Sequence, residues 1–175
     1  MLNGKKVAYY TLGCKLNFSE TSTISRQLDN IGYVKTNFDN KADLYVINTC
    51  SVTENANKEC RRIIRKVKRT APESMVVITG CYAQLKPESI SAIDGVDMVV
   101  GANDKFKIPD LLKNYKSKTT EIHGCSINNL DYHSSFSLND RTRSFLKIQG
   151  SPHQPRLNKI MIVRLLHQVQ VLNYY

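Results

Sequence analysis

The residues of this chain best suited to chemistry are three cysteines, Cys14, Cys50 and Cys81, which each follow a short apolar run. Because thirty or more residues separate each cysteine from the next, none belongs to a local C-x-x-C motif. Thiolates bind soft metals and iron–sulfur clusters, whereas a single cysteine is most often a small buried hydrophobic residue. Taken one at a time, the three cysteines leave both interpretations open.

The elements that would position these thiols alternate between strands and helices. The apolar runs predict strands at 7–11, 44–48, 75–79 and 97–100. Helical spacing of apolar residues predicts helices between and after them: one capped by Asn17 or Ser19 and ending at Ile31, one from Thr53 to Arg69, one at 87–93 and one at 106–112. This alternation predicts an α/β fold, with a mostly parallel sheet covered by helices on both faces.

In such a sheet the loops that leave the carboxyl ends of the strands open on one edge, where these folds bind ligands. We therefore expect the three thiols to converge there. A structural zinc site normally has four protein ligands, and no fourth cysteine or histidine is well placed. Three thiolates with one open position are better suited to an iron–sulfur cluster in which one iron lacks a protein ligand.

The domain organisation follows from changes in composition along the 175 residues. We place the α/β domain at 1–116, a polar, Ser- and Asn-rich linker at 117–140, and the first strand of a new unit at 141–149. The remaining residues, 150–175, contain no acidic side chain and are expected to form an irregular C-terminal extension.

The formal charge of +10 and the pI of about 9.4 favour a polyanionic partner such as nucleic acid, although a merely basic protein has the same balance. The N-terminus lacks the apolar core of a signal peptide, and no run of about 18 apolar residues is present. We therefore expect a cytoplasmic protein with reduced cysteines and no membrane partner.

The segment from Lys58 to Arg69 carries seven positive charges against one negative charge on a predicted helix. Such a helix would attract an RNA backbone without reading its sequence, whereas a charge run is also typical of a solvated helix face. The candidate RNA-binding residues are Arg61, Arg62, Arg65, Lys66, Lys68 and Arg69.

Three segments, TLGCKLNFSE, VINTCSVTENA and VITGCYAQ, resemble in type and order the signature motifs of the radical-SAM methylthiotransferases. The resemblance covers residues 5–149, and the first motif is most similar to the branch that modifies threonylcarbamoyladenosine in tRNA. It implies a flavodoxin-like domain that binds a 4Fe-4S cluster through Cys14, Cys50 and Cys81. Neighbouring polar groups would shape the loops and donate hydrogen bonds to cluster sulfurs, or would simply satisfy local turns: Asn17, Asn48, Thr49 and Gly80.

The resemblance also implies an activity, the addition of a methylthio group at C2 of the adenosine beside the anticodon, with tRNA and a sulfur donor as partners. Cys60 and Cys125 match no motif, and His123 with Cys125 forms only a short H-x-C pair.

After Gln149 the family continues into a C-x-x-x-C-x-x-C motif that holds a second cluster and S-adenosylmethionine, and this chain has no cysteine there. We therefore expect neither group in this chain and identify no catalytic residue. We interpret the tail as truncated or frameshifted coding sequence and expect the isolated chain to be inactive. The alternative is a standalone iron–sulfur or flavodoxin-like binding module that acts with a partner.

Overall fold

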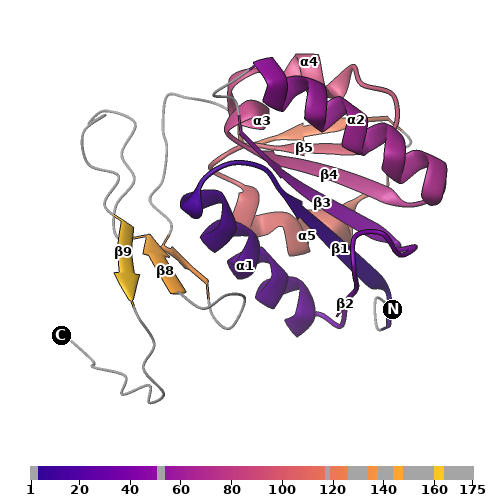
Figure 1. Cartoon of the computed structure of the whole chain (residues 1–175). Coiled ribbons are helices and arrows are strands. Elements are labelled where there is room, and N and C mark those ends of the chain that lie inside the picture. The colour runs from indigo at the N-terminus through magenta and orange to yellow at the C-terminus, as the bar shows by residue number, and fades with distance from the viewer. Residues whose placement is uncertain are drawn as a thin grey trace.

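The computed structural model describes residues 4–50, 54–116, 119–125, 134–137, 144–147 and 160–163. Its centre is a sheet of six parallel strands in the order β2-β1-β3-β4-β5-β6 (Figure 1). In chain order the strands of this sheet are β1 (Lys6–Thr11), β2 (Val34–Lys35), β3 (Leu44–Thr49), β4 (Met75–Gly80), β5 (Met98–Val100) and β6 (Glu121–His123).

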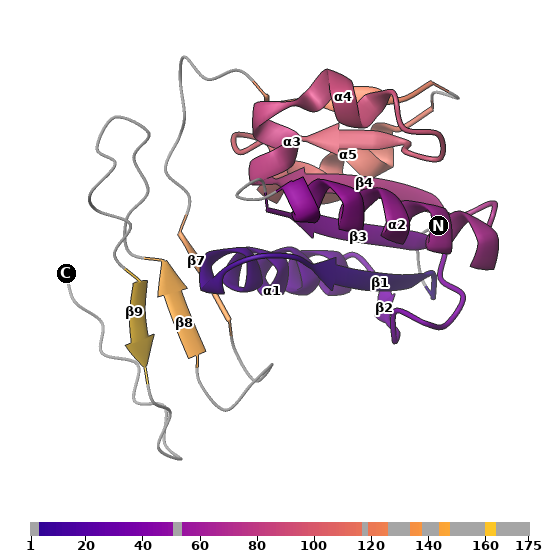
Figure 2. The same ribbon diagram turned by 45° about the horizontal axis from the view of Figure 1, so that its top comes forward.

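The helices form a layer on each face of this sheet (Figure 2). One hydrophobic cluster joins the sheet to α1 (Lys15–Asn30) and α5 (Ile108–Asn114), through side chains such as Ile24, Leu28 and Ile108. The other joins the opposite face to α2 (Glu54–Thr70), α3 (Cys81–Leu85) and α4 (Pro87–Ser91). A short 3-10 helix, η1 (Lys105–Lys107), precedes α5.

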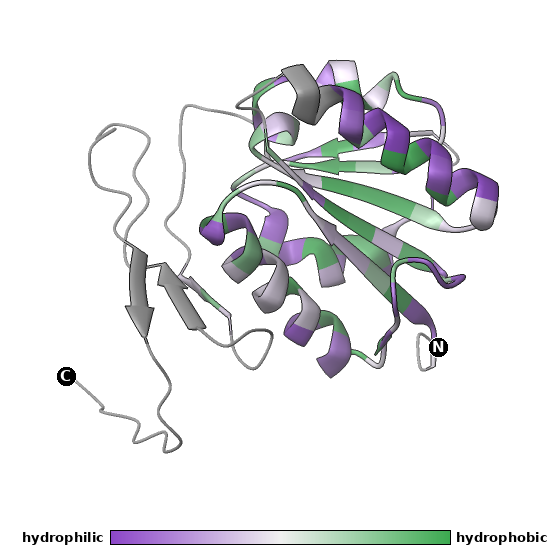
Figure 3. Ribbon diagram, viewed as in Figure 1, coloured by the Kyte–Doolittle hydropathy of each residue, from purple (hydrophilic) through white to green (hydrophobic). Residues whose placement is uncertain are grey.

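The central strands are buried on both faces, as expected for parallel strands covered by two helix layers. Every residue of β3 is buried, and so are the four central residues of β4. Figure 3 shows that much of these two strands has the green of hydrophobic residues. The sheet order reverses direction between β1 and β3, because β2 lies outside β1 while the later strands extend past β3. Folds of this kind bind ligands at such a switch point, beyond the carboxyl ends of the strands.

A second, smaller sheet is antiparallel and has the order β7-β8-β9. Its strands are β7 (Ser135–Phe136), β8 (Ser144–Lys147) and β9 (Ile160–Val163). β7 lies along α1, where Thr23 Oγ1 accepts a hydrogen bond from the Phe136 backbone N–H and Arg26 Nη2 donates one to Phe136 O at 2.7 Å. The Arg26 guanidinium also lies 3.9 Å from the centre of the Phe136 ring.

The parallel sheet with helices on both faces confirms the predicted fold class. The predicted N-cap of the first helix is wrong, because α1 begins at Lys15 with Cys14 as its N-cap residue, and Asn17 and Ser19 are buried inside the helix. The predicted cap Thr53 lies outside the described residues.

The segment 117–140, interpreted as a linker, contains β6, which extends the parallel sheet, and β7. In the C-terminal extension the structure describes β9. No helix in the described part of the chain has the length and apolar character needed to cross a membrane.

Candidate functional site

The three cysteines lie at the carboxyl ends of three neighbouring strands, β1, β3 and β4. Cys14 is the N-cap residue of α1, Cys50 directly follows β3, and Cys81 is the first residue of α3 directly after β4. Cys14 and Cys81 are exposed, Cys50 is half-buried, and none forms a disulfide. The structure therefore brings these three residues to one edge, and Cys14 and Cys50 flank the switch point between β1 and β3.

The pKa of the Cys81 thiol is shifted by the groups around it. Although the residue is exposed, surrounding protein atoms partly desolvate its thiol and raise its pKa, and the Glu20 carboxylate raises it further. Cys50 and Cys14 act in the same direction, while Lys105 opposes them. The three thiols are thus close enough to influence one another.

Two glycines allow the cysteine loops to approach each other. Gly13 has a φ of 112°, and a Cβ there would lie 2.8 Å from Cys50 Cβ and 3.2 Å from Cys50 Sγ. Gly80 has a φ of 99°, and a Cβ there would press against Thr49 O and Asn48 Oδ1. Because other residues rarely adopt these φ values, both positions require glycine for conformation as well as for space.

A buried pair of asparagines ties the first turn of α1 to the end of β3. Asn17 Nδ2 lies within 3.1 Å of three acceptors, Leu12 O, Asn48 Oδ1 and Thr49 O. Asn48 Nδ2 donates in return to Asn17 O at 3.0 Å and to Thr21 Oγ1 at 3.1 Å. These bonds hold the backbones that carry Cys14 and Cys50 in one arrangement.

The same contacts bear on the predicted roles of Asn17 and Thr49. The Asn17 amide group is directed at protein acceptors, and its Oδ1 accepts from Cys14 Sγ at 3.4 Å. The Thr49 hydroxyl donates to Thr79 O at 2.6 Å. These contacts favour the alternative in which both residues shape the loops, and donation to cluster sulfurs stays a prediction.

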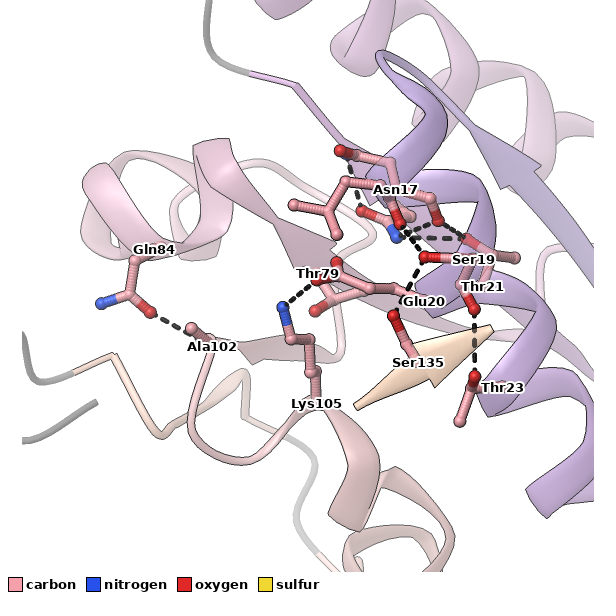
Figure 4. Close-up of polar contacts among 12 residues, drawn as sticks. Asn17, Ser19, Glu20, Thr21, Thr23, Thr79, Gln84, Ala102, Lys105 and Ser135 are labelled. Carbon is pink, nitrogen blue, oxygen red and sulfur yellow. Dashed lines mark hydrogen bonds and ion pairs between the residues drawn. The ribbon is translucent and has the colours of Figure 1, made fainter. Parts of the chain in front are cut away.

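A buried ion pair lies beside this edge (Figure 4). Lys105 Nζ in η1 is 2.7 Å from Glu20 Oε1 in α1, and their side chains are only 11% and 4% exposed. Both charges influence the pKa of Cys81, so the pair lies near the thiols. The sequence did not predict this ion pair, because the partners are 85 positions apart and neither belongs to a pattern that indicates pairing.

The remaining two cysteines are placed differently. Cys60 belongs to α2 and is fully buried on the core side of that helix. Burial raises the pKa of its thiol to about 11. Cys125 follows β6, so it also reaches the carboxyl edge, but its Sγ lies 3.6 Å from Ala83 O and packs against the core. The His123 ring contacts Glu121 Oε2 at 2.9 Å, and among the described residues His123 and Cys125 belong to no group of three side chains that could hold a metal ion.

The donor set fits a cluster better than a single ion. Among the described residues, no three side chains of His, Cys, Asp or Glu form a group that could hold a metal ion. In a 4Fe-4S cluster each thiolate binds its own iron, so the three sulfurs do not have to meet at one point. Three thiols on three adjacent strand ends fit this requirement, and a cluster held by them would have one iron without a protein ligand.

The predicted RNA-binding residues lie along α2 but are not equivalent. Arg62 pairs with Glu59, Lys66 with Asp39, and Lys68 with Asp97. Arg61, Arg65 and Arg69 form no ion pair within the described residues and are exposed.

Comparison with known proteins gives a family match over residues 6–101, to the one described as "Uncharacterized protein family UPF0004". The chain is 42% identical over 150 residues to the threonylcarbamoyladenosine tRNA methylthiotransferase MtaB of Bacillus subtilis, covering 82% of this chain and 33% of that protein. The Aquifex aeolicus protein of the same name is 30% identical over 185 residues, covering 95% and 44%.

The tRNA-2-methylthio-N(6)-dimethylallyladenosine synthase of Clostridium novyi is 31% identical over 124 residues, covering 67% of this chain and 27% of that protein. The chain thus spans less than half the length of each of these curated relatives.

Proposed function

Because the chain belongs to protein family UPF0004 and its relatives are tRNA methylthiotransferases, we propose that it is the iron–sulfur domain of such an enzyme. The observation that carries the proposal is the convergence of Cys14, Cys50 and Cys81 on one sheet edge. All three lie within the matched residues 6–101.

The three thiolates would each bind one iron of a 4Fe-4S cluster. When bound, the cluster would supply an iron with an open position for a sulfur species. Asn17 and Asn48 hold the loops of Cys14 and Cys50 together, and Gly80 lets the loop of Cys81 approach them. These contacts support the proposal, because they would hold Cys14, Cys50 and Cys81 as a preformed set of ligands at the strand ends.

We further propose that the substrate of the intact enzyme is threonylcarbamoyladenosine in tRNA, modified at C2. The support is that the Bacillus subtilis and Aquifex aeolicus proteins named for that base align with 82% and 95% of this chain, whereas the Clostridium novyi synthase named for dimethylallyladenosine aligns with 67%. A sulfur donor would be the second partner.

The test is anaerobic reconstitution of the reduced chain with iron and sulfide, followed by iron counting and absorption spectroscopy. We expect a cluster signal that Cys14→Ala, Cys50→Ala and Cys81→Ala each abolish. Cys125→Ser is the matched control, because Cys125 lies at the same edge on a different strand, and it should keep the signal, as should Cys60→Ala. A chain that binds no iron, or loses it equally in the controls, would refute the proposal.

The sequence contains no C-x-x-x-C-x-x-C motif, so we expect the 175 residues alone not to methylthiolate tRNA even with the cluster bound. Turnover by the reconstituted chain would contradict this expectation. A defined complex with a protein that supplies the second cluster would instead favour a standalone module acting with a partner.

A further inference from the structure

A groove of about 560 Å³ lies along α2, in the helix layer that α2 forms with α3 and α4. Its lining is almost entirely cationic, with a single acidic side chain; the lining residues are Lys58, Arg62, Arg65, Lys68, Arg69 and Asp94. We call this feature the basic groove. Lys58, Arg62, Arg65 and Arg69 recur every three to four residues, with Lys68 next to Arg69, so the cations form one stripe along the helix.

Ion pairing divides the stripe into neutralised and available charges. Glu59 accepts hydrogen bonds from both Nε and Nη2 of Arg62, and Lys68 Nζ contacts Asp97 and Ser74 O. Lys58, Arg65 and Arg69 have no ion-pair partner in the described part of the chain and are exposed. Three positive charges in the basic groove are therefore free to bind an anion.

We propose that the basic groove binds the phosphate backbone of a base-paired RNA stem. The proposal rests on the proposed function, which supplies tRNA as the partner. A stripe of cations on a rigid helix matches a row of phosphates held in place by a duplex. Single-strand sites instead combine cations with aromatic side chains on which bases stack, and no aromatic residue lines this groove.

The position of the groove fits a stem held next to the reaction edge. α2 begins at Glu54, four residues after Cys50, so its first turn starts near the thiols. From Lys58 to Arg69 the stripe then extends about 16 Å away from that edge, at 1.5 Å per residue. A stem bound along it would run from the cysteine edge toward the opposite edge of the sheet.

The number of available cations sets the expected salt dependence. With three phosphate contacts and a slope of about 0.9 per contact, raising salt from about 50 to 200 mM should weaken binding about 40-fold. In Arg65→Ala/Arg69→Ala one contact remains, and the same change should weaken binding only about fourfold. Asp94→Asn removes the one opposing charge of the groove and should strengthen binding.

The experiment measures binding of a fluorescein-labelled RNA hairpin to the full chain by anisotropy over a salt series. The matched control is Lys66→Ala/Lys113→Ala, which removes the same number of charges where the side chains pair with Asp39 and Asp110 outside the groove. We expect the control to keep the steep salt dependence. An unpaired RNA of equal length should bind more weakly than the hairpin.

Three outcomes would overturn the inference: equal effects of the two double variants, binding of the unpaired strand at least as tight as the hairpin, or capture of phosphatidylserine vesicles instead of RNA. None of these RNA-binding measurements needs the cluster. RNA binding by the basic groove and iron binding by the three cysteines can therefore each be confirmed or refuted without the other.

Discussion

The buried ion pair between Glu20 and Lys105 leads to a quantitative prediction about stability. We expect Lys105→Met to lower the free energy of unfolding by about 3–5 kcal/mol, the usual cost of leaving one buried charge without its partner. The side chains are only 11% and 4% exposed, so solvent cannot replace the lost contact. Single domains are stable by about 5–15 kcal/mol, so the variant should lose a large share of its stability.

The double variant Glu20→Gln/Lys105→Met separates the pairing from the individual side chains. It removes both charges while keeping the shapes close to the originals, and such replacements are often nearly neutral. We therefore expect the double variant to be more stable than either single variant. The coupling energy from the double-mutant cycle should amount to several kcal/mol, which only an interacting pair produces.

The assay is urea unfolding of the reduced, metal-free chain, followed by circular dichroism for the wild type and the three variants. Lys113→Met is the control, because Lys113 forms an exposed pair with Asp110. It should change stability by less than about 1 kcal/mol, as surface pairs do. Additive effects of the two single substitutions, or a Lys105→Met loss no larger than that of the control, would refute the reasoning.

Two further predictions concern the cysteine loops and the core. Gly80→Ala should destabilise the chain by about 2–3 kcal/mol and impair cluster uptake, because φ is positive there and the new Cβ meets Thr49 O. The control is Gly4→Ala, which also has a positive φ but open space around the new Cβ, and it should cost about 1 kcal/mol. Equal losses of stability in the two variants would contradict the clash at Gly80. Unfolding free energy should fall by about 2 kcal/mol between pH 9 and 11, because the Cys60 pKa is raised from 9.0 to about 11 and the folded state keeps a proton that the unfolded state releases. Urea midpoints across that range that stay constant would exclude this linkage.

The sequence predicted the parts of the fold that depend on continuous apolar runs. β3 and β4 are buried on both faces, and their unbroken β-branched or apolar stretches are typical of that environment. Because Cys50 and Cys81 directly follow these strands, the same patterns also predicted that their thiols share an edge. Strand β6 was missed because its three residues, one of them apolar, carry too little pattern.

The parts that depend on distant pairing were not predictable from spacing. Asn17 appeared suitable as a helix cap, since asparagine favours that position. Its side-chain amide instead donates a hydrogen bond from α1 to Asn48 on β3, a contact that exists only once the two elements are side by side. The one local sequence feature that marks the true start of α1 is Gly13, whose positive φ turns the chain just before the helix. The helix therefore begins at Lys15, two residues before the predicted cap Asn17.

Because the three thiols come from the ends of three separate strands, the site cannot form before those strands have paired. Cys14 and Cys50 become neighbours when β1 pairs with β3, and Cys81 joins them only when β4 pairs with β3. No short peptide cut from the chain could reproduce this arrangement. During synthesis, any group that needs all three thiols must therefore wait until the ribosome has released the chain beyond Cys81 and the sheet has formed.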